Sequence, residues 1–314
     1  MRRDGNNGKR HFADGGKNGN IPSFPSQREA FSVEGEGRTI VVGEIPYLNT
    51  LPIFTALKRH FPLEYAEFVQ GHPAELNRSL REGLIDITPG SSIEFARHPE
   101  KYFIVPDISI SSRIRVKSVL LFSPYPVEEE KRLEVLSTNR SATSVVLLKI
   151  LLTAFLGKDL TIIPSDNPWE ESRSRNFPAL LIGDEAIRRF LENEKSPSQK
   201  VYDLGEMWHK HTGLPFVFAL WIIPTHSWEE KKRPLKKFVR ALLDAKKISE
   251  QMIRYRDSRM PSPENIPLSF LHDYWSNLSY NLGEELEGLR MFYRLARDVG
   301  EIPSLPELRF LPLP

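Results

Sequence analysis

Residues 216–224 read FVFALWIIP, a stretch without a charged side chain. An uninterrupted apolar run of this length is typical of a strand that is buried on both faces of a sheet. Alternating strand-like and helix-like segments precede the stretch, and charged helical sequence without clear strands follows Pro224 to the end of the chain. We therefore expect residues 216–224 to be a buried strand that brings the chain back to the lobe in which it began near residue 38.

The segments before this strand alternate regularly from Arg38 onward. Strands are expected at 39–44, 63–70, 84–88, 102–110, 116–123, 133–137, 160–165, 179–184 and 200–205. Apolar residues at helical spacing predict helices at 51–60, 72–83, 91–99, 142–157, 185–194 and 206–211. Strands that alternate with helices of about ten residues indicate βαβ units, a largely parallel sheet and an α/β fold.

Two breaks interrupt this alternation. Residues 123–132 (SPYPVEEEKR) carry two prolines and a run of charges, and residues 211–216 (HTGLPF) form a second break. Both suit crossovers between two lobes. The predicted domains are a tail at 1–37, a first lobe at 38–124 and 215–314 that includes the C-terminal helices, and an inserted second lobe at 125–214. Such lobes enclose a cleft, and ligands bind beyond the carboxyl ends of strands in open parallel sheets. One continuous sheet is the alternative that the pattern leaves open.

The composition is that of an ordinary globular chain. Of 314 residues, 40% are hydrophobic and 27% are charged. The 43 basic and 41 acidic residues nearly balance, which argues against nucleic acid as a partner. No apolar stretch approaches the ~18 residues of a membrane span. The lack of cysteine excludes disulfides, thiolate metal sites and cysteine nucleophiles. A small molecule is therefore the expected partner.

The first 37 residues differ from the rest. They hold seven of the 18 glycines and few large apolar side chains. We predict a disordered tail, because such a segment cannot bury enough apolar surface to offset its ordering entropy. Arg2 and Arg3 suggest a twin-arginine signal, but no apolar stretch follows them. We therefore predict no export signal and a cytoplasmic location.

Polar residues stand where the first expected strand turns into the first expected helix. Residues 47–50 read YLNT, with Pro46 and Pro52 on either side. Asn49 or Thr50 suits a helix cap, which satisfies backbone N–H groups at the start of a helix. The same place is the edge of a sheet where ligands bind. Taken alone, the residues favour the cap.

Two further serines and one strand serine carry weaker signals. Ser91 and Ser92 follow the Pro89–Gly90 turn, where they can cap the next helix or form an anion site with its free N–H groups. Ser118 lies in the apolar run 116–123 beside Lys117. A serine in a strand is usually tolerated through a hydrogen bond to a nearby carbonyl, so the pattern alone favours no function for it.

The start of the long helix at 142–157 carries more polar groups than a cap requires. Ser141, Thr143 and Ser144 crowd this start, and Asn139 and Arg140 precede it. One hydroxyl is enough to cap a helix, whereas several hydroxyls with an arginine suit a carboxylate or phosphate. An anionic ligand and a plain cap are equally compatible with these residues.

The remaining polar motifs favour structural roles. Asp184, between a strand and a helix, is predicted to be an N-cap. His209 and His211 stand two apart on an expected helix and so point to different faces, which argues against a metal site. The sequence lacks the GxGxxG, P-loop, GxSxG and HExxH patterns, which disfavours dinucleotide enzymes, NTPases, α/β-hydrolases and zincins.

Five motifs in order carry a resemblance to a known family. They are YLNTLP (47–52), ISISSRIRVKSVLLFS (108–123), SATSVVLLKILL (141–152), LLIGDEA (180–186) and YDLGEMWHKHTGLPFVFALW (202–221). Together they resemble the chorismate dehydratase family of the futalosine route to menaquinone. The resemblance implies a type II periplasmic-binding-protein-like fold, with two α/β lobes, a double crossover and a central cleft. It therefore argues against one continuous sheet.

The resemblance also implies an activity and its residues. The family removes water from chorismate to give 3-[(1-carboxyvinyl)oxy]benzoate without a cofactor. Its functional asparagine falls on Asn49 and its functional serine on Ser118, so both are expected to be catalytic. We expect the substrate-binding residues to include Ser91, Ser92, Ser141, Thr143 and Ser144, and we expect no metal. The sequence offers no obvious general base, so the side-chain carboxylate of the substrate is the hypothesised proton acceptor.

Two rival functions share this architecture. A solute-binding receptor would use the same fold and the same anion-holding helix start, but is expected to carry an export signal or a lipoprotein cysteine. The related dihydroxynaphthoate-forming enzyme of the same pathway is expected to carry a different set of motifs. Both remain alternatives to the dehydratase.

Overall fold

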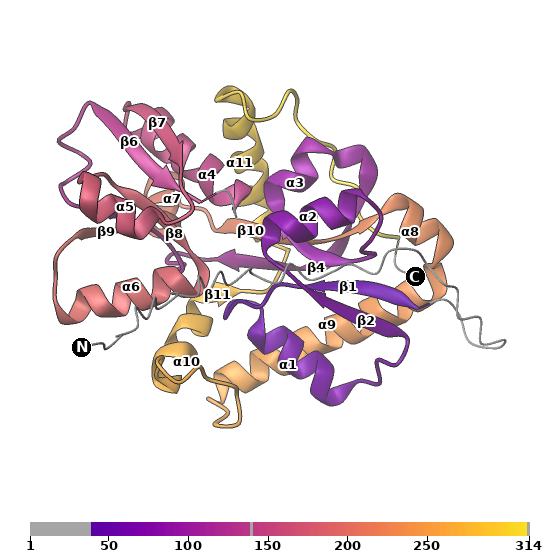
Figure 1. Ribbon diagram of the computed structural model, residues 1–314. Helices are drawn as coiled ribbons and strands as arrows, with labels where there is room; N and C mark the ends of the chain where they lie inside the picture. The colour runs from indigo at the N-terminus through magenta and orange to yellow at the C-terminus, as the bar shows by residue number, and fades with distance from the viewer. Residues whose placement is uncertain (1–38, 139–140, 313–314) are drawn as a thin grey trace, which may run out of the picture. The chain divides into compact units, whose positions relative to one another are not determined.

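The computed structural model describes residues 39–138 and 141–312 (Figure 1). The predicted tail at 1–37 and the two residues Asn139 and Arg140 lie outside these ranges. Everything below concerns the described part of the chain. None of its helices is both long and apolar enough to span a membrane.

The strands form three sheets. In chain order they are β1 Ile40–Glu44, β2 Ala66–Gln70, β3 Thr88–Ser91, β4 Tyr102–Ser112, β5 Val119–Ser123, β6 Arg132–Ser137, β7 Asp159–Pro164, β8 Ala179–Ile182, β9 Lys200–Asp203, β10 Phe216–Pro224 and β11 Leu278–Ser279. β1 pairs with β2, a second sheet has the order β11-β4-β10-β3, and a third has the order β7-β6-β8-β5-β9. The third sheet draws all its strands from residues 119–203, so its first strand precedes residue 125.

The helices connect and cover these strands. They are α1 Leu51–His60, α2 Pro73–Arg81, α3 Ser92–Arg97, the 3-10 turn η1 Pro99–Lys101, α4 Ala142–Lys149, the π-helical turn η2 Ile150–Phe155, α5 Pro168–Arg175, α6 Gly183–Lys195, α7 Leu204–Thr212, α8 Thr225–Glu230, α9 Lys232–Arg254, α10 Leu268–Asn277 and α11 Glu285–Asp298. The prediction of helical sequence after Pro224 is confirmed, apart from the two residues of β11. The helix expected at 142–157 consists of α4 and η2.

β10 is the strand predicted from the apolar run. All nine of its residues are buried, and it pairs with β3 on one side and β4 on the other. β3 and β4 precede the five-stranded sheet in sequence and β10 follows it. The prediction that this strand is buried is confirmed. β10 joins the sheet of β3 and β4, whereas β1 pairs with β2.

The prediction of a largely parallel sheet is wrong. β10 runs antiparallel to both β3 and β4, and β5 runs antiparallel to β8 and β9. The named strands pair in parallel at β1–β2, β6–β7 and β6–β8. β10 lies beside β4, the strand from which the chain leaves this sheet, and runs antiparallel to it. Periodicity in the sequence reports burial and not strand direction.

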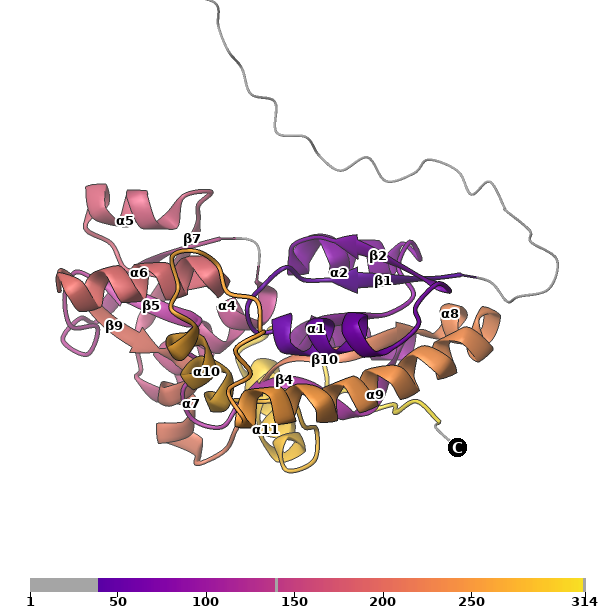
Figure 2. The ribbon, with the colours of Figure 1, turned by 90° about the horizontal axis from the view of Figure 1, so that it is seen from below.

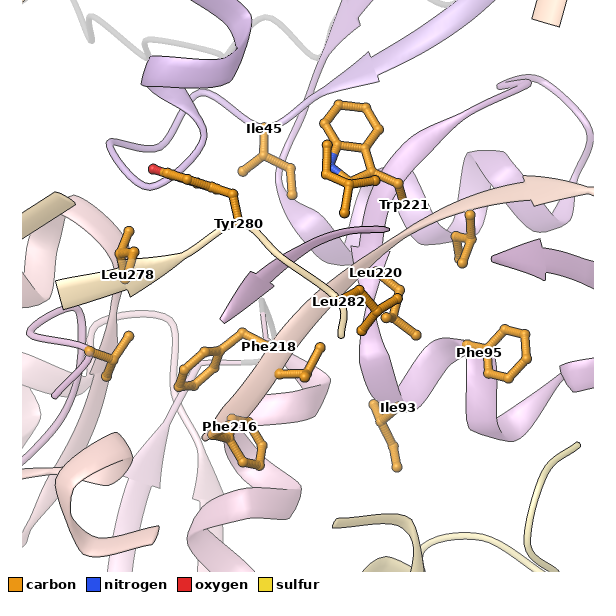
Figure 3. Close-up of a cluster of buried hydrophobic side chains, with 14 of the residues drawn as sticks. Ile45, Ile93, Phe95, Phe216, Phe218, Leu220, Trp221, Leu278, Tyr280 and Leu282 are labelled. Carbon is orange, nitrogen blue, oxygen red and sulfur yellow. The ribbon is translucent and has the colours of Figure 1, made fainter. Parts of the chain in front are cut away.

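The C-terminal helices are built into the core. α10 lies between α9 and the five-stranded sheet (Figure 1, Figure 2). Figure 3 shows Phe218, Leu220 and Trp221 of β10 in one buried cluster with Tyr280 and Ile45. Residues after β10 therefore pack against the loop that follows β1. This packing positions the candidate site.

Candidate active site

The loop at 45–50, which joins β1 to α1, is closed by its own hydrogen bonds. Thr50 Oγ1 donates to the carbonyl oxygens of Ile45 at 2.7 Å and Tyr47 at 2.9 Å. Among the described residues, no side chain caps the first amides of α1. The prediction that Asn49 or Thr50 caps this helix is therefore wrong, because the Thr50 hydroxyl faces backward into the loop.

Three side chains from distant parts of the chain hold the backbone of the same loop. Asp184 Oδ1 accepts a hydrogen bond from the Leu48 amide at 3.0 Å. Trp275 Nε1 donates to the Leu48 carbonyl at 2.7 Å, and the Tyr280 hydroxyl donates to the Asn49 carbonyl at 2.8 Å. The backbone on both sides of the Asn49 side chain is thereby fixed.

The Asn49 side chain has an acceptor without a partner. Its Oδ1 atom is buried and accepts no hydrogen bond from the described residues. A buried polar atom without a partner costs about 1–3 kcal/mol and needs an explanation in a native structure. A donor on a bound ligand would satisfy this atom.

Ser118 lies directly before β5 rather than inside it and is buried. Its hydroxyl donates to the Val116 carbonyl at 3.3 Å and accepts from the Tyr274 hydroxyl at 3.0 Å. Asp203 holds the preceding turn, since its carboxylate accepts the amides of Val116 at 3.1 Å and Lys117 at 2.7 Å. Lys117 adopts a left-handed conformation, with φ of 55°. Ser118 is thus positioned from both sides.

Gly183 and Asp184 connect Ser118 to the loop of Asn49. The Gly183 amide donates to the Ser118 carbonyl at 2.7 Å, and Asp184 accepts the Leu48 amide. Gly183 has φ of +62°, and a Cβ atom there would lie 3.1 Å from the Tyr47 ring. A side chain at this position would therefore strain the backbone and crowd the Tyr47 ring. These contacts bring the two predicted catalytic residues into one region.

The prediction that Asp184 is an N-cap is wrong. α6 begins at Gly183 with Ile182 in the cap position, so Asp184 lies inside the first turn. Its carboxylate serves the Leu48 amide instead. Burial raises the pKa of Asp184, while the Leu48 amide and Arg188 act in the opposite direction.

Burial also raises the pKa of Tyr274 well above its usual value. The hydrogen bond with Ser118 acts in the opposite direction, and the carboxylates of Asp184 and Asp203 raise the pKa further. The phenol therefore stays protonated and remains available as a donor to Ser118.

The hydroxyls at the helix starts form a second polar group. Ser92 Oγ lies 3.4 Å from Thr143 Oγ1, which accepts the Ile93 amide at 3.2 Å. Ser141 caps α4: its Oγ accepts the Ser144 amide at 3.4 Å and donates to Ser144 Oγ at 2.7 Å. The starts of α3 and α4 therefore meet through Ser92 and Thr143.

Ser91 is engaged elsewhere. Its hydroxyl accepts from Asn77 Nδ2 at 3.0 Å, and its amide donates to Asn77 Oδ1 at 3.4 Å. Both side chains are buried. Of the five predicted substrate-binding residues, Ser91 thus has a clear structural partner, whereas Ser92 and Thr143 contact each other.

A pocket of about 330 Å³ lies against the outer side of the Asn49 loop. Its lining consists of Glu44, Ile45, Pro46, Tyr47, Leu48, Thr50, Leu51, Phe54, Gln70, Asp184 and Pro261–Pro263. Neither Asn49 nor Ser118 lines it, so we do not assign it to the substrate.

The structure offers no cluster for a metal ion within the described residues. There, no group of three or more histidine, aspartate or glutamate side chains is arranged to hold one. The His211 ring stacks on Phe155, with 4.8 Å between the ring centroids.

Sequence reasoning missed the residues that hold the two predicted catalytic groups. Tyr274, Trp275 and Tyr280 fall in the stretch 272–281, HDYWSNLSYN, where three aromatic side chains with polar tips stand close together. A buried tyrosine or tryptophan usually needs a hydrogen-bond partner. Three aromatic side chains with polar tips within residues 274–280 are the sequence pattern from which hydrogen bonds to the site could have been predicted.

Solved structures show the fold. The chain is similar to the alkanesulfonate-binding protein of Xanthomonas axonopodis pv. citri bound to MOPS, with a TM-score of 0.62 and 12% identity over 87% of this chain and 97% of that one. A Candida albicans protein described as having the generic periplasmic binding protein fold matches with a TM-score of 0.58 and 13% identity, over 88% and 98% of the two chains. The predicted periplasmic-binding-protein-like fold is confirmed.

Sequence comparison shows the family. Residues 40–298 match a family described as menaquinone biosynthesis. The chain is 32% identical over 274 residues to the chorismate dehydratase of Thermus thermophilus, covering 81% of this chain and 94% of that one. It is 34% identical over 184 residues to the chorismate dehydratase of Campylobacter jejuni, covering 57% and 66%. The chain therefore belongs to the chorismate dehydratase family of menaquinone biosynthesis.

Proposed function

We propose that this chain carries out its family's reaction at Asn49 and Ser118, converting chorismate to 3-[(1-carboxyvinyl)oxy]benzoate and water. The assignment of residues rests on the buried Oδ1 atom of Asn49, which has no partner among residues 39–138 and 141–312. Three hydrogen bonds hold the backbone of its loop. A fixed polar group without a partner in the free protein is suited to a ligand.

The reaction is driven mainly by the formation of an aromatic ring. Chorismate is a cyclohexadiene with a ring carboxylate, an enolpyruvyl ether carboxylate and a C4 hydroxyl. Loss of the C3 proton and the C4 hydroxyl releases one water and leaves an aromatic ring, which makes the reaction strongly favourable. The C3–H bond is vinylogous to the ring carboxylate, so negative charge develops on that carboxylate as the proton leaves. Fixed hydrogen-bond donors stabilise such charge.

The two side chains match different atoms of the substrate. As a dianion, chorismate has one hydrogen-bond donor, its C4 hydroxyl. Asn49 Oδ1 is an acceptor, so we assign it to that hydroxyl. Ser118 has a proton to donate, so we assign its hydroxyl to the ring carboxylate. The hydroxyls of Ser141, Thr143 and Ser144 are proposed to hold the remaining carboxylate.

The proton acceptor is proposed to be the substrate itself. The enolpyruvyl carboxylate is attached through oxygen to C3 and can reach the C3 proton. It takes this proton and returns it to the departing C4 hydroxyl, so that one water leaves and the carboxylate is regenerated. Asp184 is a protein carboxylate that contacts the Asn49 loop, but its Oδ1 accepts the Leu48 amide. A crystal with bound product that shows a carboxylate or histidine of the protein beside C3 would remove this proposal.

Conversion of chorismate separates the proposed function from its rivals. Purified protein incubated with chorismate should yield a product that is lighter by one water in mass spectrometry. A solute-binding protein of this fold would bind chorismate and leave it unchanged, and the dihydroxynaphthoate-forming enzyme would not consume it. Unchanged chorismate would therefore contradict the dehydratase. A cytoplasmic location for this activity stays a prediction.

A further inference from the structure

The segment formed by α10 and β11 contacts both proposed catalytic residues. Tyr280 donates to the Asn49 carbonyl, whereas Tyr274 donates to the hydroxyl of Ser118. Tyr280 thus fixes a backbone atom, whereas Tyr274 contacts the Ser118 hydroxyl, which is proposed to contact the substrate. The Tyr274 contact alone affects the direction in which the Ser118 proton points.

A serine hydroxyl carries one proton, and its orientation depends on its neighbours. The Tyr274 hydroxyl, at 3.0 Å, occupies one acceptor position of Ser118 Oγ. The proton of Ser118 must therefore point away from Tyr274. In the structure it faces the Val116 carbonyl at 3.3 Å, which is a long hydrogen bond. A charged substrate oxygen is a stronger acceptor than this carbonyl.

We propose that Tyr274 is a positioning residue for the dehydration, since its hydrogen bond directs the Ser118 proton toward the substrate carboxylate that gains charge. The proposal rests on the function proposed above for Ser118. Hydrogen bonds in a chain polarise one another, so donation from Tyr274 also strengthens Ser118 as a donor. Burial keeps the pKa of Tyr274 high, which keeps its proton in place.

The test is the substitution Tyr274→Phe, alone and together with Ser118→Ala. We expect the single variant to lower kcat about two- to tenfold with little change in KM, because one hydrogen bond between neutral groups is lost. In the Ser118→Ala background the same substitution should have no further effect on kcat. Tyr202→Phe is the matched control, since its hydroxyl bonds Glu128 Oε2 at 2.8 Å and not a site residue; its kcat should be unchanged.

An unchanged kcat in Tyr274→Phe, or an equal loss in both backgrounds, would overturn the proposal. If the wild-type protein does not convert chorismate, the proposed function is wrong. The role of Tyr274 is then tested by comparing the Ser118 side chain in crystal structures of the wild type and Tyr274→Phe. In the crystal structure of Tyr274→Phe, the Ser118 side chain should change its rotamer or occupy two rotamers, and an unchanged rotamer would overturn the proposal.

If Tyr274→Phe does not fold, 3-fluorotyrosine at position 274 is the second variant. Its hydroxyl is a stronger donor, so kcat should rise only when Ser118 is present, and any other result counts against the proposal.

Discussion

At the scale of single residues, Asn49 distinguishes a structural role from a catalytic one. The sequence alone favoured a helix cap, which would make Asn49 a contributor to stability. In the structure its Oδ1 atom is buried and has no hydrogen-bond partner among the described residues, while Thr50 closes the loop. Asn49 therefore lowers the free energy of unfolding of the free protein, and a ligand that donates a hydrogen bond to Oδ1 is expected to remove this destabilisation.

The substitution Asn49→Ala should lower turnover without lowering Tm. We expect kcat to fall about ten- to a hundredfold, because the C4 hydroxyl loses the acceptor that fixes its orientation, and misplacement of a reacting group costs that much. Melting curves and chorismate assays on the same preparation provide the measurement. Asn77→Ala is the control for a buried asparagine that has partners, and it should lower Tm because both hydrogen bonds between Asn77 and Ser91 are lost. Normal turnover with a lowered Tm in Asn49→Ala would show that the residue is structural.

At the scale of elements, the start of α6 joins two polar groups that lie far apart in the sequence. Gly183 leaves room for the Tyr47 ring because it has no side chain, and the Asp184 carboxylate accepts a hydrogen bond from the Leu48 amide. The pattern of a strand, a glycine and an aspartate before a helix suggested a cap. Sequence pattern could not reveal the actual partner, which lies 136 residues away.

The pair Asp184→Ala and Asp184→Asn tests whether this residue holds the loop. Alanine leaves the Leu48 amide without its acceptor, so kcat should fall about tenfold or more as Asn49 loses its fixed position. Asparagine still offers an oxygen to that amide and should keep most of the activity. Product formation is measured for both variants. If Asp184 were instead the general base, the two variants would lose activity equally, because an amide cannot take a proton from C3.

At the scale of the whole molecule, burial was predictable and strand direction was not. The apolar run at 216–224 identified β10 as a buried strand, since burial on both faces leaves no polar alternation. Its antiparallel pairing with β3 and β4 arises from how the chain leaves and re-enters the sheet. Local periodicity contains no information about that path.

Part of the candidate site was also predictable from the sequence. The family resemblance placed function on Asn49 and Ser118, and the structure joins these two residues through Gly183 and Asp184. The support from Tyr274 and Tyr280 was not predicted, because these contacts span 156 and 231 residues of sequence. Contacts at such separations depend on the packing of α10 and β11, which no local pattern reports.

The proposed site requires one substrate to engage both polar groups, the Asn49 loop and the start of α4. Hydrogen exchange with and without bound 3-[(1-carboxyvinyl)oxy]benzoate measures this directly, since ligand contact slows the opening of backbone amides. We predict slower exchange at residues 47–50 and at residues 141–144 together, with no change in α5 as the internal reference. Protection at one of the two segments alone would contradict a shared site.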